Sequence, residues 1–168
     1  MDRKMSRPIA DHDVPPRNAS ASARSRWTAD LDVGPFEVIE HIGFESFELS
    51  VEGQLHADVV FDHSAAFAAW GPIVLELGQV HAIDERLAAA YGLATGAVSH
   101  VSWIVDDLAE ESARLDRLGC RLINTARSGP VHVAWHHGGP LFPHPIELHA
   151  RSEVVATMHQ RLTRLRET

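Results

Sequence analysis

The second half of the chain has the clearer pattern of hydrophobic and polar positions. Runs rich in β-branched and aromatic residues predict four strands, at residues 98–105, 120–126, 131–136 and 145–150. Between the first two runs, leucines recur on one face of a predicted helix over 107–118. Asp107 caps the start of this helix, and Gly119 supplies its stop. The predicted order is therefore one strand, one helix and three strands.

The first half repeats this order less clearly. A segment rich in Ala, Ser and Arg predicts a helix over 17–31, and later runs predict strands at 36–42, 65–70 and 73–78. A weak strand near residue 12 would complete the same order of elements.

Residues 64–70 (SAAFAAW) carry two opposing signals. Their alanine content favours a helix. The Gly71-Pro72 turn, followed at once by the apolar run IVLEL, favours the first arm of a hairpin. We predict a strand here. Residues 44–63 hold two further β-rich runs around Gly53, which indicate a hairpin or an extended excursion.

The repeated order predicts an α+β fold of two tandem βαβββ modules. A short amphipathic helix predicted over 82–91 lies between them. The predicted boundaries are a flexible N-terminal arm at 1–11, a first module at 12–80, a linker helix at 81–96, a second module at 97–150 and a C-terminal helix at 151–168.

The composition narrows the classes of function. The 15 Lys and Arg residues against 23 Asp and Glu give a formal net charge of −8, which is unfavourable for general binding to a nucleic-acid backbone. A single cysteine excludes an intrachain disulfide scaffold and a cysteine-rich zinc site. No apolar run approaches the roughly 20 residues that span a bilayer, and the N-terminus lacks the pattern of a signal peptide. We expect a cytoplasmic protein with no membrane or nucleic-acid partner.

Two carboxylates lie in apolar strand segments, where a charge needs a partner. Glu76 lies within LEL near the end of the first half, and Glu147 lies within IEL near the end of the second. Burying a lone carboxylate is costly unless it is paired or binds a metal. Each half also offers a histidine on its opening strand, His12 and His100. Two neutral imidazoles and two carboxylates suit one divalent metal ion, with Zn, Ni, Co, Mn and Fe all open.

Three more residues are candidate substrate contacts. Trp103 and Trp135 lie on predicted strands, and we expect them in the core or in the wall of a pocket. His149 belongs to a group of five histidines between residues 132 and 149. We expect this group to face the entrance of the pocket rather than to form a second metal site.

Four segments carry a resemblance to a known family: RWTADLDVGPF (26–36), AAFAAWGPIVLEL (65–77), AVSHVSWIVDDLAEESARLDRLGCRL (97–122) and HPIELHA (144–150). Together they resemble the vicinal oxygen chelate superfamily, which includes glyoxalase I, methylmalonyl-CoA epimerase, extradiol dioxygenases and bleomycin-resistance proteins. They are most similar to its glyoxalase-like, epimerase-type branch. The resemblance covers residues 12–150, with a gap at 44–63.

The resemblance implies that the two modules form a curved mixed sheet around a metal or ligand cleft. It implies metal ligands at Glu76, His100 and Glu147, and at His12 when Trp27 anchors the comparison. The segment around His12, HDVPPRNA, departs from the apolar strand that the family has there. The resemblance also implies a small-molecule substrate and a homodimer.

Such a site implies a metal-dependent isomerase, epimerase or lyase that enolises a small carbonyl, hydroxy-carbonyl or acyl-thioester substrate. A metal with open positions can hold two substrate oxygens and stabilise the charge formed when a proton next to a carbonyl is removed. Glu147 is the first candidate for the base, and Glu76 is the second. Two alternatives stay open: an Fe(II) extradiol-type dioxygenase, and a non-catalytic protein that binds or sequesters a small molecule with the same fold.

Overall fold

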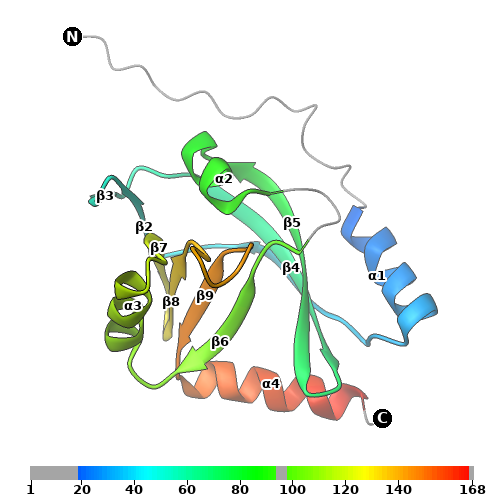
Figure 1. Ribbon diagram of the computed structural model, residues 1–168. Coiled ribbons are helices and arrows are strands. Elements are labelled where there is room, and N and C mark those ends of the chain that lie inside the picture. Colours follow the sequence, from blue (N-terminus) through cyan, green and yellow to red (C-terminus); the bar gives the residue numbers. More distant parts are fainter. Residues whose placement is uncertain (1–18, 94–97, 167–168) are drawn as a thin grey trace. The chain divides into compact units, whose positions relative to one another are not determined.

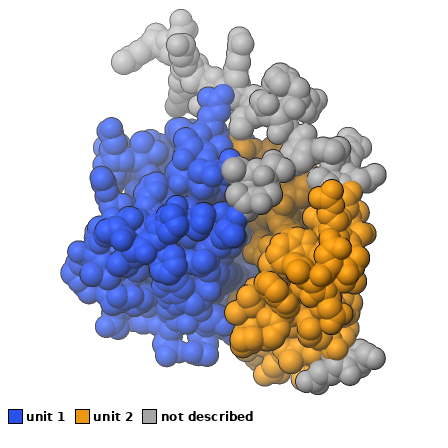
Figure 2. All heavy atoms as spheres, turned by 45° about the vertical axis from the view of Figure 1, so that its right-hand side comes forward, with its two compact units in different colours: residues 1–7, 44–60, 84–152 blue, residues 8–43, 61–83, 153–168 orange. Residues whose placement is uncertain are grey.

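The structure is a computed structural model that describes the chain except for residues 1–18, 94–97 and 167–168. The described residues form an α+β protein of four helices and nine strands, and its last element is the helix α4 (Figure 1). They divide into two compact units (Figure 2), each built on one sheet. Unit 1 takes the described residues of 44–60 and 84–152, and unit 2 takes those of 8–43, 61–83 and 153–168.

Unit 1 holds a mixed six-stranded sheet in the order β3-β2-β7-β8-β9-β6. Neighbouring strands are antiparallel, except that β6 and β9 are parallel. The strands are β2 (Ser46–Val51), β3 (Gln54–His56), β6 (Val101–Val105), β7 (Leu122–Ser128), β8 (Val131–His136) and β9 (Ile146–Ala150). The second half of the chain therefore contains the four predicted strands.

Helix α3 (Leu108–Arg117) packs on one face of this sheet. Its N-cap is the predicted Asp107, whose Oδ1 accepts a hydrogen bond of 2.9 Å from the backbone N–H of Glu110. Gly119 follows the helix with a φ of 85°, a conformation that glycine adopts without strain. The buried residues between the helix and the sheet are Leu115, Cys120, Ile146 and Leu148. These four residues hold the strands that carry the candidate site.

Helix α2 (Glu85–Tyr91) begins later than the pattern predicted. Asp84 is its N-cap, and the Oδ1 of Asp84 accepts a hydrogen bond of 2.8 Å from the backbone N–H of Arg86. The residues before Asp84 continue a strand, β5, which ends at Ile83. The prediction of a helix from residue 82 was therefore wrong at its start, because a good cap two residues later fixes where the helix begins.

The segment 44–63 contributes a hairpin to the sheet of unit 1. β2 and β3 pair antiparallel, which confirms one of the two alternatives raised by the sequence. Glu52 and Gly53 make the turn, with φ values of 52° and 80°. β2 also pairs with β7, which comes from the second half of the chain. The two compact units therefore do not follow the two halves of the sequence.

Unit 2 holds a three-stranded antiparallel sheet in the order β1-β4-β5. Its elements are α1 (Ala19–Leu31), β1 (Glu37–Ile42), β4 (Phe61–Trp70), β5 (Ile73–Ile83) and α4 (Glu153–Arg166). β4 includes the disputed residues 64–70, so the strand prediction is confirmed. Gly71, with a φ of 60°, turns the chain from β4 into β5. Helix α1 contacts β5, and helix α4 contacts β4.

The element order bears on the predicted tandem repeat. In the second half, β6, α3, β7, β8 and β9 follow one another as one strand, one helix and three strands. In the first half, α1, β1, β4 and β5 match the predicted helix and the three strands after it. The strand expected near residue 12 lies outside the described residues, so the tandem arrangement stays a prediction. None of the helices in the described parts of the chain is long and apolar enough to cross a membrane.

Candidate metal centre

Glu147 is the centre of a polar group on the sheet of unit 1. It lies in β9 between Ile146 and Leu148, which both belong to the core under α3. Side chains alternate between the two faces of a strand, so Glu147 points to the face away from α3. Only 7% of the residue is exposed. The apolar pattern IEL therefore delivers a carboxylate to a buried position, as the sequence indicated.

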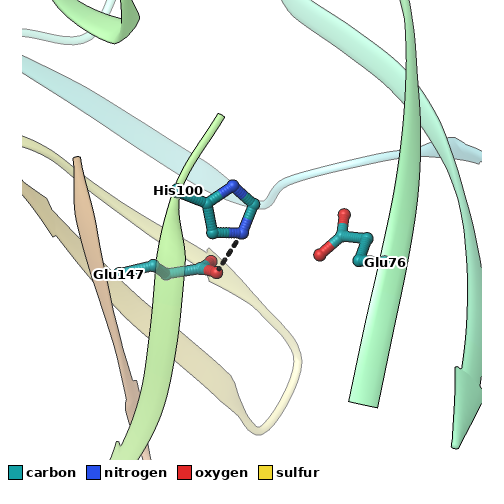
Figure 3. A group of neighbouring side chains, drawn as sticks. All are labelled: Glu76, His100 and Glu147. Carbon is teal, nitrogen blue, oxygen red and sulfur yellow. Dashed lines mark ion pairs between the residues drawn. The ribbon is translucent and has the colours of Figure 1, made fainter. Parts of the chain in front are cut away.

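Two imidazoles flank this carboxylate. His100 Nε2 lies 3.3 Å from Glu147 Oε2, an ion pair that Figure 3 draws as a dashed line. His149 Nε2 lies 3.1 Å from the same oxygen. His149 follows Glu147 by two residues and so shares its face of β9. His100 directly precedes β6, in which Ser102 is in register with Glu147.

The two imidazoles determine the charge of Glu147. Burial by itself raises the pKa of this carboxyl. Hydrogen bonds from His100 and His149, together with the charges of these imidazoles, lower the pKa by more than burial raises it. The net result is a pKa well below the usual range, so Glu147 is an anion at neutral pH.

The spacing of the donor atoms suits a metal ion. Ligands of a tetrahedral zinc ion lie at about 2.0–2.2 Å from the metal, which places them about 3.3 Å from one another. The 3.3 Å between His100 Nε2 and Glu147 Oε2 matches that separation. Ser99 Oγ lies 2.9 Å from His100 Nδ1. A partner on the other ring nitrogen fixes the orientation of a metal-binding imidazole. His100 and Glu147 can therefore hold a metal ion.

An aromatic stack lies beside this pair. Trp135 in β8 is in register with Glu147 in β9, and its ring lies 4.4 Å from that of His100. Tyr91 stacks on Trp135 at 4.5 Å between ring centroids, with 25° between the planes. The Tyr91 hydroxyl donates a hydrogen bond of 2.7 Å to Asn124 Oδ1. Burial, and then the charge of Glu147, raise the pKa of Tyr91. Trp135 thus packs beside His100, and its contact with a substrate stays a prediction.

Sequence reasoning missed Tyr91 and Asn124. Tyr91 lies on the apolar side of a short helix, a signal that predicts packing but not the identity of its neighbours. Asn124 lies on β7 in register with Trp135, and this register depends on an irregularity in the pairing between Leu122 and Asn124. The sequence contains no signal for that irregularity.

The remaining site residues have different placements. Trp103 packs against the core under α3, on the face of the sheet opposite Glu147, so the structure gives its expected contact with substrate no support. Glu76, also labelled in Figure 3, is half-buried on β5 of unit 2, where it is in register with Phe67. His12 lies outside the described residues. His149 contacts Glu147, which the sequence did not predict, and its predicted contact with a substrate stays a prediction.

Comparisons with known proteins identify no family for this chain. The chain matches no protein-family model and no curated protein. The resemblance to the vicinal oxygen chelate superfamily therefore stays a prediction, and the functional argument depends on the residues described above.

Proposed function

We propose that the chain binds one divalent metal ion through Glu76, His100 and Glu147, and that it acts as a metal-dependent isomerase, epimerase or lyase. The substrate is a small carbonyl, hydroxy-carbonyl or acyl-thioester compound. The observation that carries the proposal is the buried Glu147 carboxylate between two imidazoles. When bound, the metal would supply positive charge that stabilises the oxyanion formed by removal of a proton next to a carbonyl.

A purely structural role accounts for this group less well. Replacing a buried ion pair by apolar residues of similar size is often neutral or stabilising. Glu147 is itself buried, so an apolar residue would be an ordinary choice at this position. A charge in such a position, with two imidazoles beside it, favours a ligand role.

Either carboxylate can be the base that removes the proton. Glu147 is the first candidate and Glu76 is the second, because each closes one half of the chain in an apolar strand segment. The lowered pKa of Glu147 belongs to the state in which His100 and His149 donate to it, and a metal ion on His100 would replace one of these donors.

Exchange of a carbon-bound proton tests this function whichever product the reaction gives. The chain is loaded in turn with Zn, Ni, Co, Mn or Fe(II) and incubated in D₂O with small α-hydroxy ketones and 2-methyl-branched acyl-thioesters. NMR then follows the replacement of hydrogen by deuterium next to the carbonyl. We expect exchange with at least one metal, its loss on chelation and its return when the metal is restored.

Three variants assign the roles. Glu147→Gln should lose both bound metal and exchange. Glu76→Gln should slow exchange about 10²–10⁴-fold, the usual contribution of a general base, if Glu76 is the base, and an unchanged rate would leave Glu147 as the base. Glu52→Gln, in the exposed turn of the β2–β3 hairpin, is the matched control and should exchange at the wild-type rate. Exchange by Glu147→Gln at the wild-type rate would contradict the proposal. So would oxygen uptake on a catechol without proton exchange, which would indicate the dioxygenase.

A further inference from the structure

A row of side chains crosses the sheet of unit 1 and ends at the candidate metal centre. Asn124 on β7 is in register with Trp135 on β8, and Trp135 is in register with Glu147 on β9. Residues opposite each other on neighbouring strands lie on the same face of a sheet, so all three side chains lie on the face away from α3. Tyr91, the last residue of α2, stacks on Trp135 on this face. The row therefore joins Asn124 and Tyr91, which sequence reasoning missed, to the candidate site.

Tyr91 is held at its backbone, its ring and its hydroxyl. Its backbone closes α2, which Gly92 ends with a φ of 60°. Its ring lies against Trp135, and its hydroxyl donates a hydrogen bond of 2.7 Å to Asn124 Oδ1. Burial raises the pKa of the Tyr91 phenol, and the charge of Glu147 raises this pKa further. The hydroxyl therefore keeps its proton and remains the donor to Asn124.

Asn124 uses one of its two polar side-chain atoms in this arrangement. The residue is fully buried, and its Oδ1 accepts the hydrogen bond from Tyr91. Among the residues that the structure describes, none offers a hydrogen-bond acceptor to Asn124 Nδ2. A buried donor without an acceptor destabilises the folded state, and an apolar residue of similar size would avoid that loss. The stability of the sheet therefore does not account for an amide at this position, whereas the contact with Tyr91 does.

His100 lies outside the sheet, so side-chain contacts must orient its ring. It directly precedes β6, which begins at Val101. Ser99 Oγ lies 2.9 Å from its Nδ1. Its ring packs against the indole of Trp135, with ring centroids 4.4 Å apart and 54° between the planes. Rings at this distance are in van der Waals contact, so Trp135 restricts the rotation of the imidazole and helps to keep Nε2 beside Glu147 Oε2, 3.3 Å away.

We propose that Tyr91 and Asn124 are positioning residues for the metal ligand His100. The hydrogen bond from Tyr91 to Asn124 fixes the phenol ring, and this ring fixes the indole of Trp135. The indole in turn keeps the imidazole of His100 turned toward Glu147. This inference rests on the proposed function, because it takes His100 as a ligand. Outer contacts of a metal-binding histidine contribute about 10–100-fold to metal affinity or activity, so the effect should be measurable.

The zinc affinity of untagged protein, measured against a coloured chelator, tests this role of Tyr91 and Asn124. Tyr91→Phe keeps the ring and removes the hydroxyl, whereas Asn124→Leu keeps the size of the side chain and removes the acceptor. We expect each change to weaken Zn²⁺ binding about tenfold. The double variant Tyr91→Phe/Asn124→Leu should weaken it no further, because both changes remove the same hydrogen bond. Thr125→Val, a change of matched size at the next position of β7, should keep the wild-type affinity.

Unfolding in urea separates positioning from a general loss of packing. Each single change leaves a buried polar atom without its partner, whereas the double variant removes both partners and should regain stability. We expect the double variant to keep the weak zinc affinity of the single variants although its free energy of unfolding rises above theirs. A zinc affinity that recovers together with stability would give Tyr91 and Asn124 a structural role only and would overturn the proposal.

The imidazole of His100 gives a readout that needs no metal. Its ring protons lie beside the indole of Trp135, whose ring current should displace their NMR signals from those of exposed histidines. Loss of the signals in His100→Gln assigns them. In metal-free protein, Tyr91→Phe and Asn124→Leu should move these signals, and Thr125→Val should not. The proposal is wrong if either the His100 signals or the zinc affinity stay at their wild-type values in both variants. Absence of zinc binding in the wild type would instead overturn the proposed function, and the His100 signals would still decide whether Tyr91 and Asn124 position the ring.

Discussion

The two units bury different side chains around their sheets, and their polar groups differ accordingly. Unit 1 buries large aliphatic residues, among them Leu49, Leu87, Leu115, Ile146 and Leu148, and its polar group is centred on a buried carboxylate. In unit 2 the buried positions of β4 are mostly alanines, and two histidines, His41 and His81, meet at an open end of the sheet. In unit 1 imidazoles donate to a carboxylate, whereas in unit 2 the carboxylate of Asp62 and the hydroxyl of Ser64 fix the imidazoles. The buried arrangement sets the charge of a carboxylate, Glu147. The exposed arrangement sets which ring nitrogen of each imidazole carries the proton.

The largest effect should come from the core that supports the buried group. Leu148 is fully buried beside Glu147, and Leu148→Ala should lower the free energy of unfolding by about 2–5 kcal/mol because it leaves a cavity. Leu55→Ala, at a position 56% exposed on the hairpin of the same unit, should change it by less than about 0.5 kcal/mol. Urea unfolding measures both. Equal effects would show that the core of unit 1 is not packed as described.

A smaller effect should follow from removal of the second imidazole of the buried group. His149→Ala takes away a hydrogen-bond donor to Glu147 and should weaken metal binding at the unit 1 site about tenfold. His144→Ala is the matched control, since His144 follows β8 in the loop before β9. Competition with a coloured chelator gives the affinities. An unchanged metal affinity in His149→Ala would contradict this role for His149 and would leave His100 as the imidazole that orients Glu147.

Acid should destabilise the protein through another buried imidazole of unit 1, that of His136. Burial lowers the pKa of His136 below its ordinary value of 6.5, although a hydrogen bond to the Cys120 carbonyl opposes this. The unfolded chain then binds a proton that the folded chain does not. The contribution of neutral His136 to the free energy of unfolding is therefore fully present above pH 6.5 and is lost as the pH drops below it. Unfolding free energies measured across this range should decline less steeply in His136→Gln. The same slope in both proteins would contradict this cause.

The smallest effect should come from an exposed ion pair of unit 2. Arg161 on α4 donates to Glu37 on β1, with 2.8 Å between Arg161 Nε and Glu37 Oε2. The Arg161 side chain is about half exposed, and pairs of this kind contribute about 0–1 kcal/mol. Arg161→Ala should therefore change the unfolding free energy by less than about 1 kcal/mol, and less still at high salt. A larger loss of unfolding free energy that does not depend on salt would indicate that Arg161 stabilises the protein by packing of its aliphatic stem rather than by its ion pair.

The sequence allowed good prediction where a local signal was strong. β8 matches its predicted range of 131–136, and Asp107 caps α3 as expected. Strand alternation also held information that could have been used further. It places His149 on the same face as Glu147. It also places Trp103 on the opposite face from His100, which argues against a shared site for these two residues.

Other features depend on contacts between distant segments. The pairing of β2 with β7 joins the two halves of the chain, and no local pattern indicates it. The meeting of His41 and His81 depends on the register of three strands and on a bulge in one of them. The pKa of Glu147 depends on neighbours from β9 and from the residue before β6. Such features follow from packing rather than from propensity.

The central claim is that Glu147 binds a metal ion, and zinc stoichiometry tests it most directly. In untagged wild-type protein, we expect calorimetry to show one Zn²⁺ per chain, and we expect Glu147→Gln to abolish that binding while the chain stays folded by circular dichroism. No binding in the wild type, or binding that survives Glu147→Gln, would contradict the account.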